Sequence, residues 1–336
     1  MTQQMTPGTM QAAAIDRFGG LAVIHPQTIP VPEVGPDEVL MHVESAGVGA
    51  WDPFEREGGF SQMLGATPTF PYVIGTDGAG TVAAVGRQVT GFHTGDRVYG
   101  AALANPKGGF YAEYAAVKAE NVAPVPRQIS TAQAGVMASD ALTALQGLEH
   151  VLGLKRGETV MIFGAGGGLG HFAVQLAKRI GARVFAVASG ADGVQLARRL
   201  GADAVVNGRA DDVTAAARAF APNGIDAALM TAGGEAADRA LAAVRDGGRV
   251  AYPNGVEPEP KARPGLRVSS YDVDVGNHAI DRLNELIGDA PFEVHVARTF
   301  PLDRAADAQR ALAEHYLGKL ALQPGSAAGG QPRSSP

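Results

Sequence analysis

The chain contains no cysteine among its 336 residues, and this absence excludes several classes of site. Disulfides, thiolate zinc sites, iron–sulfur clusters and a cysteine nucleophile all require the missing sulfur. Lysine and arginine are also few, 28 against 34 acidic residues, and they form no cluster of the kind that binds a phosphate backbone. We therefore expect a small-molecule substrate and no nucleic-acid partner.

Long hydrophobic runs are missing as well. No window approaches the roughly 18 apolar residues that span a membrane, and the opening stretch MTQQMTPGTMQAAAID has no basic segment followed by an apolar one. We expect a cytoplasmic protein with no membrane partner. Residues 325–336 are small, polar and rich in glycine and proline, so a disordered tail is predicted there.

Glycine and hydrophobic residues are abundant, and the length suits two domains with real cores. From Gln11 to Val125 glycine and proline separate short β-branched runs, which is typical of a compact strand-rich domain. After Pro126, strands alternate with helices, and this predicts right-handed βαβ units on a parallel sheet. The predicted strands are 159–163, 183–188, 204–206, 225–230, 248–252 and 266–271, and the predicted helices are 131–152, 169–180, 192–200, 211–220 and 235–245.

The segment from Phe292 to Leu322 is the last one with a regular pattern. It predicts a strand, a turn at residues 300–303, a helix over 304–314 and a strand over 319–322. Two placements are open: the segment extends the parallel sheet, or it returns to the first domain.

A glycine cluster follows the predicted strand 159–163 and opens a helix. Glycine suits such a turn because it tolerates unusual backbone angles and lets the main chain approach a pyrophosphate. The free N–H groups and the positive dipole end of the helix then hold the anion. We predict that this turn binds a dinucleotide through residues Gly164, Ala165, Gly166, Gly167, Gly168, Leu169 and Gly170.

The choice between NADPH and NADH should be visible where the next strand ends. An NAD-binding chain carries Asp or Glu there to hold the ribose 2′-OH, whereas this chain has Ala188 and Ser189. Ser189 is able to donate a hydrogen bond to a 2′-phosphate. Arg209 either pairs with that phosphate or sits on a solvated loop. We predict NADPH.

With these residues in hand, the chain resembles the zinc-independent branch of the medium-chain dehydrogenase/reductase superfamily, the quinone oxidoreductase (zeta-crystallin-like) group. The similarity covers almost everything from Met10 to Leu322. Besides the glycine turn, the segments that carry it are Ser45–Asp52, Ile74–Val82, Thr94–Val98, Gly109–Tyr114, Ala141–Ala144, Gly247–Val250 and Gly318–Leu322.

The resemblance implies an α/β protein with a GroES-like, β-rich catalytic domain and a Rossmann domain with a doubly wound parallel sheet. The expected boundaries are 10–125 and 276–324 for the GroES-like domain and 126–275 for the Rossmann domain. The resemblance also implies a homodimer formed through the edge of the Rossmann sheet, near Val268–Val275.

The chain departs from the family at several positions. Zinc-dependent relatives carry Cys near Gly49 and a His-Glu pair at Thr76-Asp77, so we expect no zinc here. Many quinone reductases of the group have Asn at Gly49, and they have Lys and Tyr near Gly193 and Gly208, where they help to hold the 2′-phosphate.

The resemblance assigns further residues to the cofactor site and to catalysis. Thr143 would lie beside the nicotinamide, although its hydroxyl could equally bond its own helix. Thr231, Ala232 and Gly233 would lie under the cofactor, with Asn254 near the substrate cleft and Lys319 as a further cofactor ligand. Tyr252 is a candidate proton donor, with solvent as the alternative, and Asp140 either contacts substrate or has a structural role in its helix.

A second group of residues would form the substrate side. Trp51, Phe54 and Phe60 suit a planar clamp for conjugated substrates, or they are ordinary packing of a small β domain. Asp52 resembles a carboxylate that orders its loop. The expected function is NADPH-dependent reduction of a quinone or an α,β-unsaturated carbonyl compound. The alternatives are a dedicated reductase of one biosynthetic intermediate and a non-catalytic nicotinamide-binding structural or sensor protein.

Overall fold

The computed structural model describes residues 6–65 and 67–325, and these residues form two compact units. Unit 1 holds the chain up to Ala138, Val296–His315 and the chain from Lys319 on, while unit 2 holds Ser139–His295 and Tyr316–Gly318. The predicted tail lies outside the described residues, apart from Gly325. Within the described ranges, no helix combines the length and the apolar character needed to cross a membrane.

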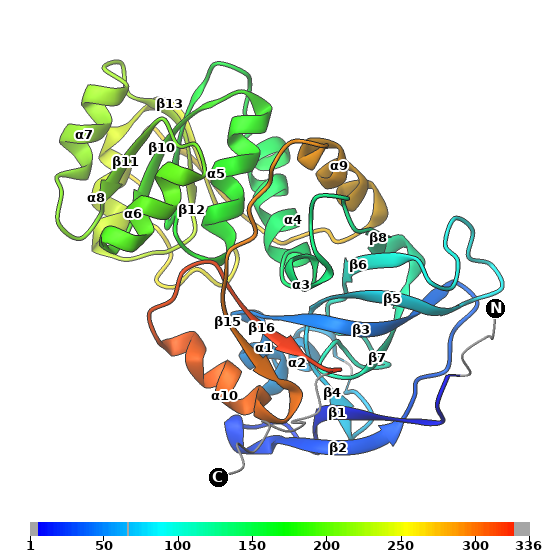
Figure 1. The fold of residues 1–336 in the computed structure, drawn as a ribbon. Coiled ribbons are helices and arrows are strands. Elements are labelled where there is room, and N and C mark those ends of the chain that lie inside the picture. Colours follow the sequence, from blue (N-terminus) through cyan, green and yellow to red (C-terminus); the bar gives the residue numbers. More distant parts are fainter. Residues whose placement is uncertain (1–5, 66, 326–336) are drawn as a thin grey trace, which may run out of the picture. The chain divides into compact units, whose positions relative to one another are not determined.

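Unit 1 is built on two sheets (Figure 1). The smaller, antiparallel sheet has the order β2–β1–β4, with β1 at Thr9–Ile15, β2 at Ile24–Pro30 and β4 at Tyr72–Val73. The larger sheet has the order β15–β16–β3–β5–β6–β8, and β7 also pairs with β3. Its strands are β3 (Glu38–Val48), β5 (Asp77–Val85), β6 (Arg97–Ala101), β7 (Tyr114–Lys118), β8 (Val122–Pro124), β15 (Val296–Pro301) and β16 (Lys319–Gln323). The expected strand-rich domain is confirmed.

The helices of unit 1 are short. They are α1 (Trp51–Arg56), α2 (Gly59–Leu64), α3 (Thr131–Ala134) and α10 (Ala305–Arg310), with single 3-10 turns at Leu21–Val23, Ala119–Asn121, Leu302–Arg304 and Ala311–Ala313.

The end of the chain belongs to the sheet of unit 1. Strand β16 pairs antiparallel with β3, with Leu320 opposite Val48, and β15 pairs parallel with β16. Figure 1 shows this arrangement, with β15 in orange and β16 in red beside the blue β3. Of the two open placements, the return to the first domain is therefore the one the structure shows.

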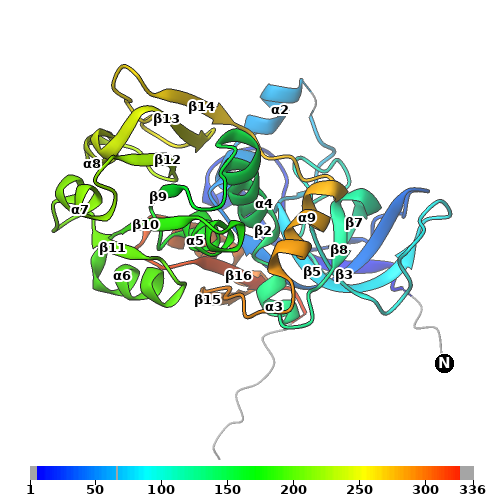
Figure 2. The same ribbon diagram turned by 90° about the horizontal axis from the view of Figure 1, so that it is seen from above.

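Unit 2 contains a six-stranded parallel sheet with the order β11–β10–β9–β12–β13–β14, which Figure 2 shows from above. The strands are β9 (Thr159–Phe163), β10 (Arg183–Ala188), β11 (Ala204–Asn207), β12 (Ile225–Met230), β13 (Val244–Pro253) and β14 (Arg267–Tyr271). Three of them match their predicted bounds because strands buried on both faces are continuous apolar runs that the sequence displays directly. The predicted βαβ organisation is confirmed.

Helices cover both faces of this sheet. They are α4 (Ala138–Gln146), α5 (Gly168–Ile180), α6 (Gly190–Arg199), α7 (Val213–Phe220), α8 (Glu235–Ala240) and α9 (Asn277–Ile287), with a π turn at Gly147–Val151 and a 3-10 turn at Leu241–Ala243. Met161 and Phe185 share one core with Ala217 of α7 and Ala237 of α8. Alternate strand residues such as Ile162 face the other side, where α5 packs against β9 and β10.

Three predicted elements differ from the structure. The single helix predicted over 131–152 is divided into α3, α4 and a π turn, and at Gly135 a Cβ would overlap the backbone of Ser45. The helix predicted over 235–245 ends at Ala240, because β13 already begins at Val244, which pairs with Ile225. Helix α9 was not predicted, although Ile280, Leu283 and Ile287 follow a helical spacing and are fully buried.

The division into units also differs from the predicted boundaries. Residues 126–138 belong to unit 1, where Ser45 Oγ donates to Ala132 O at 3.0 Å. Residues 276–295 belong to unit 2. There α9 packs against α5, and the Phe292 ring stacks parallel to that of Phe172, with 6.0 Å between the ring centres. This apolar packing holds the segment on the parallel sheet.

Candidate functional site

The predicted phosphate-binding turn connects β9 to α5 in unit 2. Gly164 takes a positive φ of 86°, which favours glycine, and the backbone N–H groups of Gly164 and Ala165 both donate to Val187 O at 2.9 Å. Gly167 N–H donates back to Gly164 O at 3.0 Å, and α5 begins at the next residue. No side chain caps this helix start, so the N–H groups of its first turn remain available for an anion.

At two glycines of this turn the packing leaves no room for a side chain. A Cβ on Gly170 would overlap the carbonyl oxygen of Gly164, and one on Gly164 would overlap Thr231 Oγ1. The Thr231 hydroxyl donates to Phe163 O at 2.8 Å and so ties the end of β12 to the end of β9. Gly233 lies equally close to the backbone of Pro258. The arrangement fits the pyrophosphate of a dinucleotide, since it needs glycine where helix, strand and anion approach one another.

The loops after β10 and β11 form the ribose end of the predicted site. Ser189 precedes α6 and its hydroxyl makes no capping hydrogen bond. Asn207 Oδ1 accepts from Gly190 N–H at 3.3 Å and from Arg209 N–H at 3.1 Å, so the two loops are held together. Within the described residues the exposed Arg209 side chain makes no ion pair.

Sequence reasoning missed one acidic group at this end. Asp192 lies in the first turn of α6, where its Oδ1 accepts from Gly193 N–H at 2.9 Å. It also stands only 2.6 Å from where a Cβ on Gly190 would be. The signal was available in the sequence, because Asp192 follows the strand end by four residues and a carboxylate there is able to accept from ribose hydroxyls.

The three predicted catalytic residues all lie in unit 2. The Thr143 hydroxyl donates to Ser139 O at 2.7 Å within α4, which is the helical alternative, and its oxygen keeps acceptor capacity. Asp140 is half-buried in the first turn of the same helix. Tyr252 is only 9% exposed, and burial together with Glu259 raises the pKa of its phenol, which makes it a poorer proton donor.

The backbone of β13 leads from Tyr252 to Asn254. Asn254 N–H donates to Tyr271 O at 2.8 Å across to β14. The Tyr271 hydroxyl in turn donates to Thr143 O at 2.9 Å, so the predicted nicotinamide-side residues on α4 and β13 are linked through one tyrosine.

The predicted aromatic clamp is a real cluster in unit 1. The rings of Trp51 and Phe60 are stacked with 5.8 Å between centres, and Phe54 meets each of them edge-on at 5.2 Å. Phe54 is 38% exposed, whereas Phe60 is buried. The structure thus brings these three predicted substrate residues together, and one edge of the cluster is open to solvent.

Asp52, on the same helix as Trp51 and Phe54, is fully buried. Its Oδ2 accepts from Gly49 N–H and from Tyr111 OH, both at 2.8 Å, so it does order the loop. Burial raises the pKa of Asp52 to about 6, against the lowering effect of these hydrogen bonds and of Lys319. Asp52 Oδ1 has no hydrogen-bond partner among the described residues.

Lys319 lies in unit 1 with its side chain buried. Its ammonium group stands 3.6 Å from where a Cβ on Gly49 would be, the position at which zinc-dependent relatives carry Cys. The cofactor role of Lys319 stays a prediction, because the phosphate turn belongs to the other unit. Across residues 6–65 and 67–325, no three His, Asp or Glu side chains are grouped to hold a metal ion.

Comparisons with known proteins match both units. A family model described as an alcohol dehydrogenase GroES-like domain matches residues 35–127, and one described as a zinc-binding dehydrogenase matches residues 168–267. The chain is 31% identical to the quinone oxidoreductase of Lama guanicoe over 245 residues, 72% of each chain.

Two further relatives are similar over nearly the whole chain. The NADPH-dependent alkenal/one oxidoreductase of Arabidopsis thaliana, a chloroplast protein, is 31% identical, and the match covers 95% of this chain and 80% of that one. A solved mycobacterial structure described as complexed with NADPH has a TM-score of 0.79 and 28% identity, and the match covers 94% of this chain and 100% of that one.

Proposed function

This chain belongs to the zinc-independent quinone oxidoreductase group of the medium-chain dehydrogenase/reductase superfamily, and we propose that it uses NADPH to reduce a quinone or an α,β-unsaturated carbonyl compound. The observation that carries this proposal is the turn Gly164–Gly170: at Gly164 and Gly170 a Cβ would overlap neighbouring atoms, and the helix that follows starts without a side-chain cap. The names of the quinone and alkenal/one reductases support the substrate class.

Different residues of unit 2 would bind different parts of the cofactor. The turn would hold the pyrophosphate, while Ser189 and Arg209 would face the 2′-phosphate with a hydroxyl and an unpaired guanidinium. Gly233, where a Cβ would overlap Pro258 O, would lie under the cofactor. When bound, the reduced nicotinamide supplies a hydride from its C4 atom.

Little further chemistry is required of the side chains. A conjugated substrate accepts the hydride once it is held in line with the donor and water is excluded. The stacked pair Trp51 and Phe60 offers a planar apolar surface of the kind that favours flat substrates. The reduced product also takes up one proton, and since Tyr252 holds its proton more tightly than an ordinary phenol, we propose solvent as the source.

The test measures loss of reduced-nicotinamide absorbance with NADPH and with NADH, against an ortho-quinone and simple enones. We expect turnover with NADPH preferred. In the Arg209→Ala variant kcat/KM with NADPH should fall about tenfold while that with NADH stays unchanged, as for a lost charged hydrogen bond. Asp192→Asn is the matched variant, and it should raise kcat/KM with NADPH by relieving repulsion.

The opposite pattern would refute the cofactor assignment. If NADH is preferred and Asp192→Asn lowers its kcat/KM, then Asp192 holds the ribose hydroxyls and the chain uses NADH. If NADPH binds but none of the quinones or enones turns over, the proposed substrate class is wrong.

A further inference from the structure

Unit 1 contains a cavity of about 90 Å³, and Phe60, the buried ring of the aromatic cluster, is one of its wall residues. Helices α1 and α2, strand β4 and the loop that follows β6 surround it. Its walls are formed by Phe18, Glu55, Phe60, Ser61, Leu64, Thr67, Pro68, Tyr72, Ala104 and Pro106. A water molecule occupies about 30 Å³ of liquid, so the space suits about three waters or a ligand of similar size.

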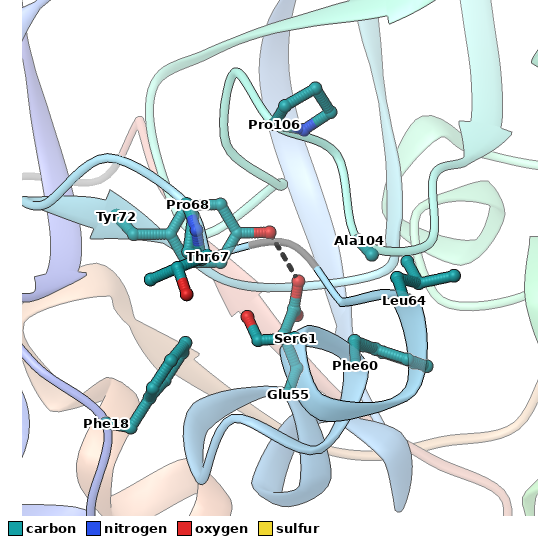
Figure 3. A pocket seen from close by; sticks show the side chains of 10 residues that line it. All are labelled: Phe18, Glu55, Phe60, Ser61, Leu64, Thr67, Pro68, Tyr72, Ala104 and Pro106. Atoms are coloured by element: carbon teal, nitrogen blue, oxygen red, sulfur yellow. Dashed lines mark hydrogen bonds between the residues drawn. The ribbon is translucent and has the colours of Figure 1, made fainter.

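Glu55 provides the only ionisable carboxyl group of this wall. The side chain is 3% exposed, and Figure 3 shows the carboxyl group pointing into the pocket toward Tyr72, with Phe18 on one side and Phe60 on the other. Glu55 Oε1 accepts from Tyr72 OH at 2.8 Å, and Oε2 accepts from Gly75 N–H at 2.9 Å. Each oxygen therefore has one neutral donor and keeps further acceptor capacity.

No cationic side chain balances this carboxyl group. Within the described residues Glu55 makes no ion pair, and none of the ten wall residues is Lys, Arg or His. The neighbouring Arg56 is directed elsewhere: it donates to Gly19 O at 2.8 Å and to Gln309, and it pairs with Glu57. A buried carboxylate without a cation is costly, so a cation that enters the cavity would stabilise the ionised form of Glu55.

The rest of the wall suits the body of an organic cation. Phe18, Phe60 and Tyr72 present aromatic rings, whose faces attract positive charge. Ser61 and Thr67 add hydroxyl oxygens, which accept hydrogen bonds from an ammonium group. Aliphatic contacts come from Leu64, with proline and alanine completing the wall. A carboxylate surrounded by aromatic and aliphatic groups is a chemically matched environment for an amine carrying a short apolar chain.

We propose that this cavity binds a small organic ammonium ion, with the Glu55 carboxylate as its counter-ion and the aromatic rings around its carbon atoms. The proposal concerns binding alone and does not depend on the proposed reductase activity. A probe of about four non-hydrogen atoms is of a size that this cavity accommodates.

The test is a ligand-detected NMR titration of the full chain with n-propylammonium and with 1-propanol, which has the same number of non-hydrogen atoms and no charge. We expect saturable binding of the ammonium ion and about tenfold weaker binding of the alcohol. Glu55→Gln keeps the shape and the acceptor for Gly75 N–H but loses the charge, and it should weaken propylammonium binding by about tenfold. Equal binding of the two probes, or binding unchanged in Glu55→Gln, would overturn the proposal.

A second pair of variants keeps the test independent of the buried substitution. Leu64 and Met63 are both exposed, at 61% and 66%, but only Leu64 lines the cavity. Leu64→Lys should place a tethered ammonium at the cavity and compete with propylammonium, whereas Met63→Lys adds the same charge one residue away and should leave binding unchanged. Equal effects of the two variants would mean that the probe binds elsewhere or responds only to net charge, which contradicts the proposal.

The pH dependence gives a further readout. Burial, together with the charge of Asp52, raises the pKa of Glu55 to about 7, while the facing phenols of Tyr72 and Tyr111 stay neutral because burial raises their pKa. The probe keeps its charge near neutrality, as lysine does. Its affinity should therefore rise about tenfold between about pH 6 and about pH 8 as Glu55 ionises. An affinity that is level over this range is incompatible with Glu55 as counter-ion.

Inhibition kinetics then show whether the cavity overlaps the place where the substrate binds. If propylammonium competes with an enone substrate, the two ligands share this place. If it binds without competing, the cavity takes a separate ligand.

Discussion

Replacing Glu55 by glutamine should change how the stability of the protein depends on pH. Glu55 is buried, and its pKa is raised from an ordinary 4.5 to about 7, chiefly by burial and against the two hydrogen bonds from Gly75 and Tyr72. In the folded protein the group therefore holds a proton that the unfolded chain has already released over this range. Since protons bound preferentially by the folded state favour folding at low pH, the free energy of unfolding should fall as pH rises from 4.5 to about 7.

The size of this effect follows from the two pKa values. Their difference corresponds to about 3 kcal/mol, which is present below pH 4.5 and absent above about pH 7. Glutamine does not titrate, so in Glu55→Gln the free energy of unfolding does not fall for this reason as the pH rises. Relative to the wild type, the variant should gain about 3 kcal/mol in free energy of unfolding between about pH 4.5 and about pH 8.

The assay is equilibrium unfolding in urea at a series of pH values, with the difference between variant and wild type taken at each pH. This difference removes the contributions of other carboxylates, such as Asp203 and Glu293, whose pKa is lowered by partners. The buffer should be phosphate or acetate, since an amine buffer is itself a candidate ligand. Glu120→Gln, at an exposed site, is the control for the substitution itself. A difference that does not vary with pH, or that falls as pH rises, refutes the account of Glu55 as an uncompensated buried acid.

Three other changes test separate parts of the molecule. Gly170→Ala, whose Cβ would overlap a carbonyl oxygen of the phosphate turn, should weaken NADPH binding more than tenfold by fluorescence titration, whereas Gly20→Ala, with open space around it, should not. Tyr271→Phe leaves Thr143 O without its donor and should lower the free energy of unfolding by about 1 kcal/mol in urea titrations. Val268, which is 40% exposed on the edge strand β14, should hold a homodimer together, so sedimentation should give twice 34.4 kDa for the wild type and a monomer for Val268→Asp.

The sequence was most informative where one local pattern determines the structure. Strand β9, the glycine turn and α5 follow one another within 22 residues, and the predicted helix over 169–180 differs from α5 by one residue. Each of these elements has a recognisable local pattern: a continuous apolar run for the buried parallel strand, a glycine cluster for the turn, and apolar residues at helical spacing for the helix. Helix α9 left a similar trace in Ile280, Leu283 and Ile287, so it was predictable in principle.

The environment of the candidate site residues was not predictable in the same way, because it depends on distant parts of the chain. Asp52 is held by Tyr111, 59 residues away. The pKa of Glu55 is raised by burial and lowered by hydrogen bonds from Gly75 and Tyr72, which are also distant in the sequence. A carboxylate on a short helix is usually solvated, so nothing local marks Glu55 as buried. The hydroxyl of Thr143 is a similar case, since only the structure shows that it bonds to its own helix.

Local patterns are readable in the sequence, whereas the surroundings of a side chain depend on distant residues. The reaction class can therefore be inferred from the sequence alone, while the cofactor and the substrate cannot. The phosphate turn is recognised through its backbone, and its glycines are fixed by overlaps that any larger residue would create at Gly164 and Gly170. Whether the site prefers a ribose with a 2′-phosphate, as in NADPH, or with a 2′-hydroxyl, as in NADH, depends instead on the side chains of the loops after β10 and β11. There a Cβ on Gly208 would come within 2.8 Å of Val187 Cγ1, so a larger residue at this position requires the Val187 side chain to shift. We expect the preference between NADPH and NADH to depend on the balance between Arg209 and Asp192, which a change of one charge is able to reverse.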